Sequence, residues 1–450
     1  MVRVTDMTHG RPIRLILLFS LPLMLGSVFQ QLYTIVDTII IGRGVGMQAL
    51  ASIGAADWIN WLVLWGLQGF TQGFAILAAQ EFGAGAYDRL RRVLAMIVKL
   101  SCWFGIAVTI ISLLLVRPLL TLLHTDPAVF GGAQTYLYVQ FGGSLIIIAY
   151  NMAAAVLRCL GDSRTPLFAI IAASFANIAL DLLFVMGFGW GIFGASFATV
   201  LAQLIAFLLC LRSLRRLPFV QLTKADWKTD PAILLHLCRL GIPTGLQMSM
   251  ITLGGMVLQS VLNGFSVVFV AGYTAANKLY GILESASVAF GYAMTAYMGQ
   301  NRGARNAARI DAGIRAVLVL SAEFTAAIVT AMLVAGKPLL GLFLSTEEAG
   351  AADALAVAYQ YLMVLMAFLF ALFMLQAYRS SLQGLGEMTV PTLSGFAEML
   401  MRMGAALVLP TFIGQSGVFF AEGAAWVCAA ALNLVWYYMR IGKIKRDMLK

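Results

Sequence analysis

Long apolar runs separated by short polar turns extend along the whole chain. Within each run the apolar residues follow one another without a period of two, so they do not predict the strands of a β-barrel. Each run is long enough for an α-helix that crosses a bilayer, which takes about 20 residues. We predict twelve membrane spans, at about residues 13–41, 51–79, 93–116, 134–157, 166–187, 192–211, 233–262, 270–298, 312–334, 355–382, 390–413 and 418–439.

The composition agrees with a membrane protein. Of the 450 residues, 61% are hydrophobic and only 11% are charged, a balance that excludes a soluble globular protein. The first apolar run continues to Ile41 without a small-residue cleavage site, so we expect a retained span and not a signal peptide. The five cysteines lack metal-ligand spacing and are expected to be free thiols. The predicted fold class is therefore an all-α polytopic membrane protein.

Two short motifs occur once in each half of the chain. The copies lie about 220 and about 225 residues apart, and a polar, basic linker at 212–230 separates a lobe at 1–211 from a lobe at 231–450. Six spans separate the copies, an even number, so both lobes insert with the same orientation and are related by a pseudo-two-fold axis along the membrane normal. The motifs, in which glycines form turns and prolines start helices, are Gln80-x-x-Gly83-Ala84 with Arg89, Gln300-x-x-Gly303-Ala304 with Arg309, Leu157-x-x-Leu160-Gly161-Asp162 with Pro166, and Leu382-x-x-Leu385-Gly386-Glu387 with Pro391.

Basic residues gather in the turns that follow spans 2, 4, 8 and 12, and in the linker. The opposite turns carry only Arg43, Arg117 and Lys337. Because cytoplasmic loops of membrane proteins are enriched in lysine and arginine, we expect both termini in the cytoplasm. The net charge of +10 thus reflects membrane topology, and no nucleic-acid partner is expected.

Asp37 and Asp181 are acidic residues inside apolar runs of the first half. Asp181 and Asn177 are four residues apart in the fifth span and therefore share one face of its helix. Asp37 lies late in the first span. A carboxylate at membrane depth is costly, so each such residue is a candidate functional site.

The polar residues of spans 1, 5 and 6 are expected at a similar depth in the membrane. Span 5 starts inside, so Asp181 is about 22 Å up the helix, whereas span 6 starts outside, so Thr199 is about 12 Å down it. Both residues fall in the outer half of a hydrocarbon core about 30 Å thick, as does Asp37. We therefore predict a cation-coupling site formed by Asp37, Asn177, Asp181 and Thr199.

The chemistry of this site leaves several alternatives open. Two carboxylates buried side by side favour protonation of one of them, as a proton-coupled carrier needs. The same carboxylates together with the oxygens of Asn177 and Thr199 could instead coordinate Na⁺. No other metal site is predicted. A third alternative is a buried polar network that only holds three helices together.

Further residues are candidates for a substrate cavity and a hinge. Gln30, Thr34 and Asp37 share a stripe on span 1, and Tyr33 flanks it. Pro22 removes a backbone hydrogen bond below them, so protonation of Asp37 could bend span 1 there, although static proline kinks are also common. On span 4, Tyr136 and Asn151 either line the same cavity or serve packing.

The second half carries charges of its own. Glu398 and Arg402 are four residues apart on span 11, a spacing that predicts a salt bridge within the helix. Glu284 on span 8 is a candidate for cation attraction or for a second coupling acid. Glu422, near the outer end of span 12, is expected to be solvated.

Taken together, these residues resemble the multidrug and toxic compound extrusion (MATE) family along nearly the whole chain. The resemblance rests on the two lobes of six spans, on Val36-Asp37-Thr38, and on the repeated glycine turns. It is greatest to the bacterial DinF-like branch, which places a carboxylate on span 1, Asn-x-x-x-Asp on span 5 and a threonine on span 6. The NorM-like branch also uses acids in spans 7 and 10, and residues 241–251 and 355–382 contain none.

The resemblance implies a secondary active antiporter of the bacterial inner membrane. It would act as a monomer among membrane lipids and export amphipathic, often cationic organic compounds such as drugs, dyes and toxins in exchange for H⁺ or Na⁺. The alternative is a flippase of the same superfamily for lipids or lipid-linked oligosaccharides, in which a strongly cationic cavity is expected.

An enzyme or an ATP-driven pump is not expected. The three histidines are scattered, and the chain contains no His-Glu-x-x-His motif, nucleophile elbow or Walker loop. No cofactor is predicted beyond the coupling ion.

Overall fold

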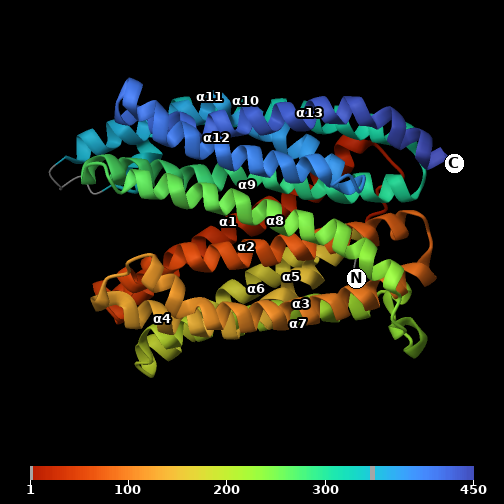
Figure 1. Ribbon diagram of the computed structural model, residues 1–450, viewed down its shortest axis with the longest axis horizontal. Coiled ribbons are helices and arrows are strands. Elements are labelled where there is room, and N and C mark those ends of the chain that lie inside the picture. Colours follow the sequence, from red (N-terminus) through yellow and green to blue (C-terminus); the bar gives the residue numbers. More distant parts are fainter. Residues whose placement is uncertain (1–3, 345–349, 450) are drawn as a thin grey trace. The chain divides into compact units, whose positions relative to one another are not determined.

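The computed structural model describes residues 4–344 and 350–449. Within these ranges the chain forms thirteen α-helices that cover most of its length (Figure 1). The helices are α1 (Pro12–Gly44), α2 (Met47–Gly83), α3 (Tyr87–Leu122), α4 (Pro127–Gly142), α5 (Ser144–Cys159), α6 (Arg164–Asp181), α7 (Gly191–Arg215), α8 (Pro231–Leu262), α9 (Val267–Gly303), α10 (Ala307–Gly341), α11 (Ala351–Gly384), α12 (Thr389–Ile413) and α13 (Phe420–Leu449). Short helices lie between them: η1 (Leu182–Gly187), η2 (Pro218–Val220), η3 (Lys224–Trp227) and η4 (Gln415–Phe419).

The helices correspond to the predicted spans. In the described part of the chain, ten helical segments are long and apolar enough to cross a membrane, and the bent pair α4–α5 gives an eleventh. The twelfth, α9, is absent from this set because polar residues such as Asn277, Lys278 and Glu284 lower its hydropathy. The predicted fold class, an all-α polytopic membrane protein, is confirmed, and the described cysteines are all free thiols.

One predicted span is not a single helix. The run at 134–157 is divided between α4 and α5, which meet at an angle of 50°. The break falls at Gly142 and Gly143, and a Cβ on Gly143 would lie 2.5 Å from the side chain of Val200 on α7. Paired glycines remove the side chains that would keep the helices apart, so the chain can turn while its backbone approaches α7.

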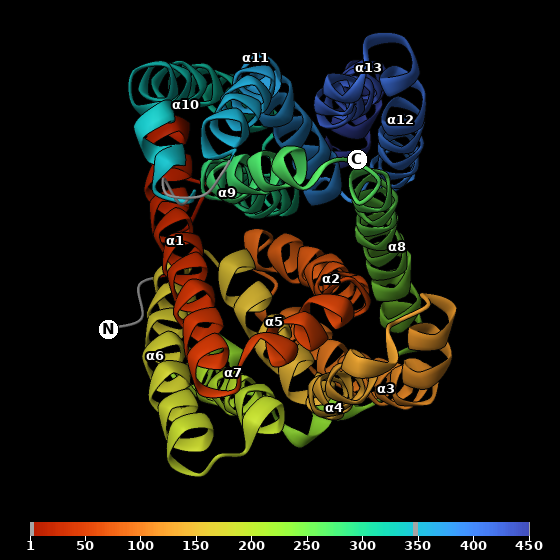
Figure 2. The ribbon, with the colours of Figure 1, turned by 90° about the vertical axis from the view of Figure 1, so that its left-hand side faces the viewer.

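The chain divides into two compact units. The N-terminal unit contains Leu21–Ser249 together with the residues up to Asp6, and the C-terminal unit contains Met7–Ser20 and Met250–Lys450. Helices α1 and α8 therefore contribute to both units, whereas each predicted lobe contained its first span entirely. Figure 2 shows α2 to α7 as one bundle and α9 to α13 as another, seen nearly along their axes. In the C-terminal bundle, α11 packs against α9, α10 and α13.

The repeated glutamine motif of the C-terminal unit anchors the beginning of the chain. The backbone NH of Met7 donates to the side-chain carbonyl of Gln300 at 2.8 Å. Asn301 and Arg309 both donate to the carbonyl of Met7, at 3.1 Å and 2.9 Å, and Arg309 also reaches the carbonyl of Gly10. Met7 is fully buried as a result. This copy of the motif thus has a structural role.

The predicted linker is docked on α3 of the N-terminal unit. Lys99 donates to the hydroxyl of Thr229 at 2.9 Å, and Arg91 lies 3.7 Å from Asp226. Burial acts to raise the pKa of Asp226, but hydrogen bonds from the backbone and hydroxyl of Thr223 and the charges of neighbouring arginines outweigh it. The pKa of Asp226 therefore lies below its ordinary value, and the carboxylate stays charged at neutral pH.

Helices α2 and α8 cross within the N-terminal unit at glycines. A Cβ on Gly73 would lie 2.6 Å from the Cα of Gly241, and a Cβ on Gly69 would lie 2.8 Å from the Cα of Gly245. Small residues let the backbones of membrane helices approach closely, which provides the van der Waals contact that holds such helices together.

The crossing predicts a sharp difference between two glycines of α2. Gly73→Ala should destabilise the protein by about 1–3 kcal/mol, because the added methyl group meets backbone atoms that cannot move aside alone. Gly54→Ala is the matched control, since nothing lies within 4 Å of its Cβ position, and it should leave stability unchanged or raise it slightly. Thermal unfolding of the purified variants checks this. Equal melting temperatures for the two would contradict the crossing.

Candidate functional site

Helix α1 lies alongside α6 in the N-terminal unit. A Cβ on Gly26 would be 3.6 Å from the side chain of Ile170 on α6, and a Cβ on Gly44 would be 2.6 Å from the sulfur of Met186 on η1, which continues α6. These two approaches pair residues 144 and 142 positions apart in the chain. Asp37 and Asp181 are also 144 positions apart, so the packing of the two helices places the two acids at one level.

An apolar cluster next to the acids holds the participating helices together. Val36 and Ile40 of α1 pack in it with Ile178 of α6, Val185 of η1 and Ala195 of α7. Each of these residues lies within one helical turn of a predicted site residue. The cluster therefore fixes the three helices at the level at which their polar groups occur.

Asp181 and Asn177 are the most enclosed of the predicted site residues. Asp181 has no exposed surface and Asn177 is 1% exposed. Among the described residues neither oxygen of Asp181 has a hydrogen-bond donor, and neither polar atom of the Asn177 amide has a partner. Such groups are costly to bury and need an explanation. Directly after Asp181 the helix changes to the π-helix η1, a distortion that occurs often at functional sites.

The carboxyl groups of Asp37 and Asp181 lie close enough to interact with each other. Oxygen Oδ1 of Asp37 is likewise buried without a donor among the described residues. Two ionised carboxylates offer acceptors only, and like charges in contact repel. The contact becomes favourable when one group carries a proton or when a cation lies between the two.

Two tyrosines adjoin the pair of acids. Tyr33 lies near Asp37 and Asp181, and Tyr136 of α4 lies near Tyr33 and Asp37. Thr34 donates to the carbonyl of its own helix at Gln30, at 2.9 Å. The predicted stripe on α1 and the predicted residue on α4 are thus brought together, while Gln30 and Thr34 themselves remain exposed.

Sequence reasoning missed two polar residues of α2 at this site. Asp57 lies near Tyr136, and the amide of Asn60 donates to the Tyr136 hydroxyl at 3.2 Å. The signal was available for Asp57, because it is an acid inside the second apolar run, as Asp37 is in the first. The sequence did not predict the break between α4 and α5. This break places Tyr136 on α4 and the later part of the predicted span, from Ser144, on α5.

Three predicted residues are not joined to the acids by hydrogen bonds among the described residues. The hydroxyl of Thr199 donates to Ala195 of its own helix at 3.1 Å, and the amide of Asn151 donates to Ile147 of its own helix at 2.9 Å. Pro22 lies inside α1, next to Leu21, where that helix passes from the C-terminal unit into the N-terminal unit.

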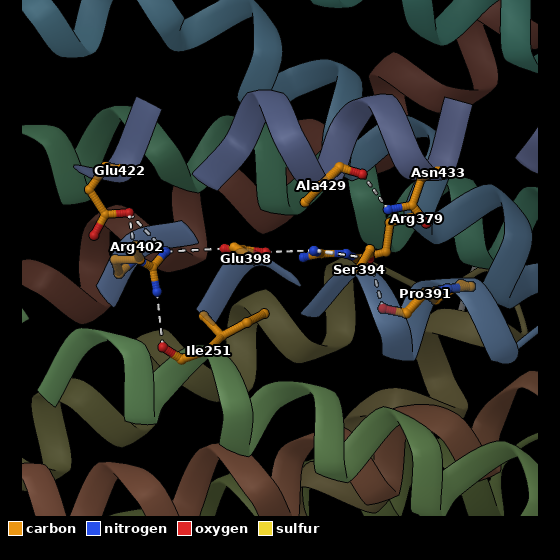
Figure 3. Close-up of polar contacts among 9 residues, drawn as sticks. All are labelled: Ile251, Arg379, Pro391, Ser394, Glu398, Arg402, Glu422, Ala429 and Asn433. Atoms are coloured by element: carbon orange, nitrogen blue, oxygen red, sulfur yellow. Dashed lines mark hydrogen bonds and ion pairs between the residues drawn. The ribbon is translucent and has the colours of Figure 1, made fainter. Parts of the chain in front are cut away.

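A chain of charges runs through the C-terminal unit (Figure 3). Glu398 of α12 accepts from Arg379 of α11 at 2.6 Å and from Arg402 at 3.1 Å, so the predicted salt bridge is present. Arg402 also contacts Glu422 of α13 at 2.8 Å and the carbonyl of Ile251 at 2.9 Å. The expectation that Glu422 is solvated was wrong, because α12 and α13 pack side by side and bring Arg402 to it.

Glu284 of α9 adjoins this chain of charges. It lies near Glu422, Tyr280 and Arg402. In contrast to Asp37 and Asp181, the acids around Arg402 have a fixed cation beside them. Within the described residues, no group of three or more histidines, cysteines or acids is placed to hold a metal ion.

An all-helical membrane protein with an internal repeat and buried acids within its spans has the architecture of a secondary transporter. The profile of the MatE family matches residues 22–183 and again residues 243–408, once in each half. The chain belongs to this family, whose members are membrane transporters and not enzymes.

Individual proteins agree with this assignment. The chain is 31% identical to the probable multidrug resistance protein YpnP of Bacillus subtilis over 455 residues, covering 99% of this chain and 98% of that protein. It is 26% identical to the probable multidrug resistance protein YoeA of the same organism, over 95% of this chain and 94% of that protein. The fold matches the crystal structure of a MATE transporter in complex with MaL6 with a TM-score of 0.91 at 23% identity, covering 99% of this chain and all of that one.

The buried charges of the C-terminal unit predict unequal effects of neutralising its two acids. Glu398→Gln should destabilise the protein by about 3–5 kcal/mol, because it leaves the buried Arg379 charged with only neutral acceptors, the new amide oxygen and the hydroxyl of Ser394, beside it. Glu422→Gln is the control and should cost less, since Arg402 keeps Glu398 and the Glu422 side chain is 17% exposed against 4% for Glu398. Melting temperatures in detergent measure both effects. The reverse order of stability would rule out Glu398 as the centre of the network.

Proposed function

We propose that the protein is a secondary active multidrug efflux antiporter whose coupling cation binds in the N-terminal unit. It exports amphipathic and cationic organic compounds in exchange for H⁺ or Na⁺, with Asp37 and Asp181 as the ion-binding groups. The observation that supports this most is the proximity of the buried Asp181 to the half-buried Asp37, with no donor among the described residues for either oxygen of Asp181 or for Oδ1 of Asp37. Such a pair gains a favourable interaction only by taking up a proton or a cation.

The nature of the cargo is inferred from the relatives. Those named above are described as probable multidrug resistance proteins, and a protein of Staphylococcus saprophyticus that is 22% identical over 94% of this chain is described as a multidrug export protein. Small organic compounds of varied structure are accordingly the proposed substrates. Tyr33, Tyr136, Gln30 and Thr34 are the proposed cavity residues beside the acids, with Asn151 further along the same bent span.

The branch, location and topology follow from the charges along the chain. We place the protein in the DinF-like branch, because the proposed coupling acids lie on spans 1 and 5, while residues 241–251 and 355–382 contain none. The turns rich in arginine and lysine, and both termini, are placed on the cytoplasmic side of a bacterial inner membrane. The protein is proposed to act as a monomer.

Coupling requires that ion binding alters the helix that carries Asp37. Neutralising the pair removes the repulsion between α1 and α6 and lets Asp37 change its partners. Pro22 lies where α1 leaves one compact unit for the other, so a bend there would move one part of α1 and leave the other in place. One charge that crosses 100 mV supplies about 2.3 kcal/mol, equivalent to roughly a 50-fold gradient of a neutral solute.

Thr199 and Asn177 would complete the site if the ion is Na⁺, because hydroxyl and amide oxygens are suitable ligands for that hard cation. A flippase for lipids or lipid-linked oligosaccharides remains the alternative function. It is less well supported, because the polar groups around Asp37 are acids, amides, hydroxyls and phenols, not a concentration of arginine and lysine.

Neutralising the two acids should abolish ion-driven export. Asp37→Asn and Asp181→Asn are each expected to lower dye efflux at least tenfold in proteoliposomes, with a ΔpH and a Na⁺ gradient imposed in separate assays. Glu323→Gln on α10 also neutralises an acid inside a span, but an exposed one, and should leave efflux unchanged. Full gradient-driven export by the double variant Asp37→Asn/Asp181→Asn would refute the proposed coupling site.

The hinge is tested separately. Pro22→Ala restores a backbone donor to α1 and should stiffen it, so coupled efflux is expected to fall several-fold while folding is retained. Pro118→Ala, at another proline inside a helix, serves as the control and should leave efflux unchanged. Wild-type rates for Pro22→Ala would mean that α1 does not bend at this residue.

A further inference from the structure

A pocket of about 410 Å³ lies at one end of the C-terminal unit, remote in sequence from the proposed coupling residues. It is formed where α9 ends, where α11 turns into α12, and along the last turns of α13. The C-terminal ends of α9 and α13 lie at the same end of the molecule (Figure 1). This volume is typical of pockets that hold small ligands. In the proposed topology this end faces the cytoplasm.

The lining of the pocket is strongly polar. Its charged residues are four basic and two acidic side chains, Arg302, Arg305, Arg440, Lys443, Glu387 and Asp447. Their balance is positive, so the pocket attracts anions. The first turn of α12 begins two residues beyond Glu387 and adds the positive end of its helix dipole.

The acids leave part of the positive charge unpaired. Arg440 lies 3.7 Å from Glu387 and stacks 5.2 Å from the ring of Trp436, and Glu387 also acts on Arg302. Among the described residues no ion pair within 4.0 Å engages Arg305 or Lys443. Two cationic groups at the pocket are thus available to an anionic ligand.

The internal repeat gives an independent reason to regard the arginines as functional. Arg305 follows α9 with φ of 55°, a left-handed conformation that strains any residue with a side chain. Its counterpart after α2 is Gly85, with φ of 67°, the residue that helix ends of this kind favour. The C-terminal unit therefore keeps an arginine at a position where the other half has the unstrained glycine.

The counterpart of Arg302 in the N-terminal unit is also an uncharged residue. It is Phe82, whose ring centroid lies 5.5 Å from that of Phe219 in an apolar contact with the linker. Two guanidinium groups have thus replaced an aromatic residue and a glycine on one of two equivalent turns. A role in folding alone would be served by the residues of the other copy.

We propose that this pocket binds the phosphate group of an anionic ligand. Arginine presents a planar fork of donors that matches phosphate oxygens, and Lys443 adds a point charge. Anionic lipid headgroups bind in comparable basic pockets at the cytoplasmic ends of membrane helices. A soluble phosphate compound has the same chemistry, so the two sources are distinguished by experiment.

The test uses the purified full-length protein in a zwitterionic detergent and measures its melting temperature. One arm adds phosphatidylglycerol against phosphatidylcholine, and a second adds glycerol 1-phosphate or inorganic phosphate. We expect the phosphate-bearing probe to raise the melting temperature with saturation. Arg305→Gly/Lys443→Gln should weaken the apparent affinity on the order of tenfold or more, because charge-assisted contacts to phosphate are lost.

The variants separate binding from folding. Arg305→Gly relieves backbone strain, so the protein is expected to fold at least as well without ligand. Arg212→Gln/Arg216→Gln removes the same charge from exposed residues near the end of α7 and serves as the control. A loss confined to the pocket variant supports the site. Response to the lipid alone identifies a headgroup, and an equal response to glycerol 1-phosphate identifies a soluble ligand.

Two results would overturn the proposal. One is the absence of any specific stabilisation by either probe, and the other is an equal loss in the pocket and control variants, which would indicate general charge attraction. Because the measurement involves no transport, its failure would leave the proposed antiport untouched, and a failure of the antiport proposal would leave this site untouched.

Discussion

Charged side chains inside this protein must find their partners within the protein, because the hydrocarbon of a membrane offers none. The two units meet this constraint in different ways. In the C-terminal unit, Glu398 is held between two arginines, and Arg402 in turn is held by Glu422. These acids are neutralised by cations that belong to the chain. In the N-terminal unit, Oδ1 of Asp37 and both oxygens of Asp181 have no donor among the described residues, and in the proposed function an ion from outside neutralises the pair.

In the proposed function, this difference gives the two halves of a repeated chain different tasks. A carboxylate with a fixed arginine partner gains little by taking up a proton, and such a group mainly holds helices together. Two carboxylates in contact without a donor store an electrostatic cost that a proton or Na⁺ relieves. Such a change could use two backbone irregularities, the π-helix directly after Asp181 and, farther along the helix that carries Asp37, the proline of α1.

The repeat also shows how one scaffold takes on separate local functions. The glutamine motif after α9 anchors the start of the chain through Gln300, Asn301 and Arg309. On the same turn, Arg305 occupies a position where the other half has Gly85. The backbone course of the turn is therefore shared, while the side chains that it presents differ between the halves. Of the two copies of the turn, the one with the strained residue, Arg305, lines a charged pocket.

Several features of the protein could be predicted from the sequence because they depend on local pattern. Continuous apolar runs require membrane helices, so the spans and the all-α fold followed directly. The spacing of Glu398 and Arg402 predicted their salt bridge, because residues four apart share a helix face. Depth along each span placed Asp37 and Asp181 at one level, which agrees with the register of α1 against α6 in the structure.

Only the tertiary structure determined which polar groups meet. Contacts of Glu422 and Arg379 depend on how α11, α12 and α13 pack, which no spacing within a single helix reveals. The break at Gly143 depends on the approach of α7, and the place of Asp57 and Asn60 beside Tyr136 depends on the packing of α2 against α4. The sequence by itself determined the helices and the depth of their charges, because the bilayer acts on each segment separately. The partners of those charges were decided by packing between segments distant in the chain.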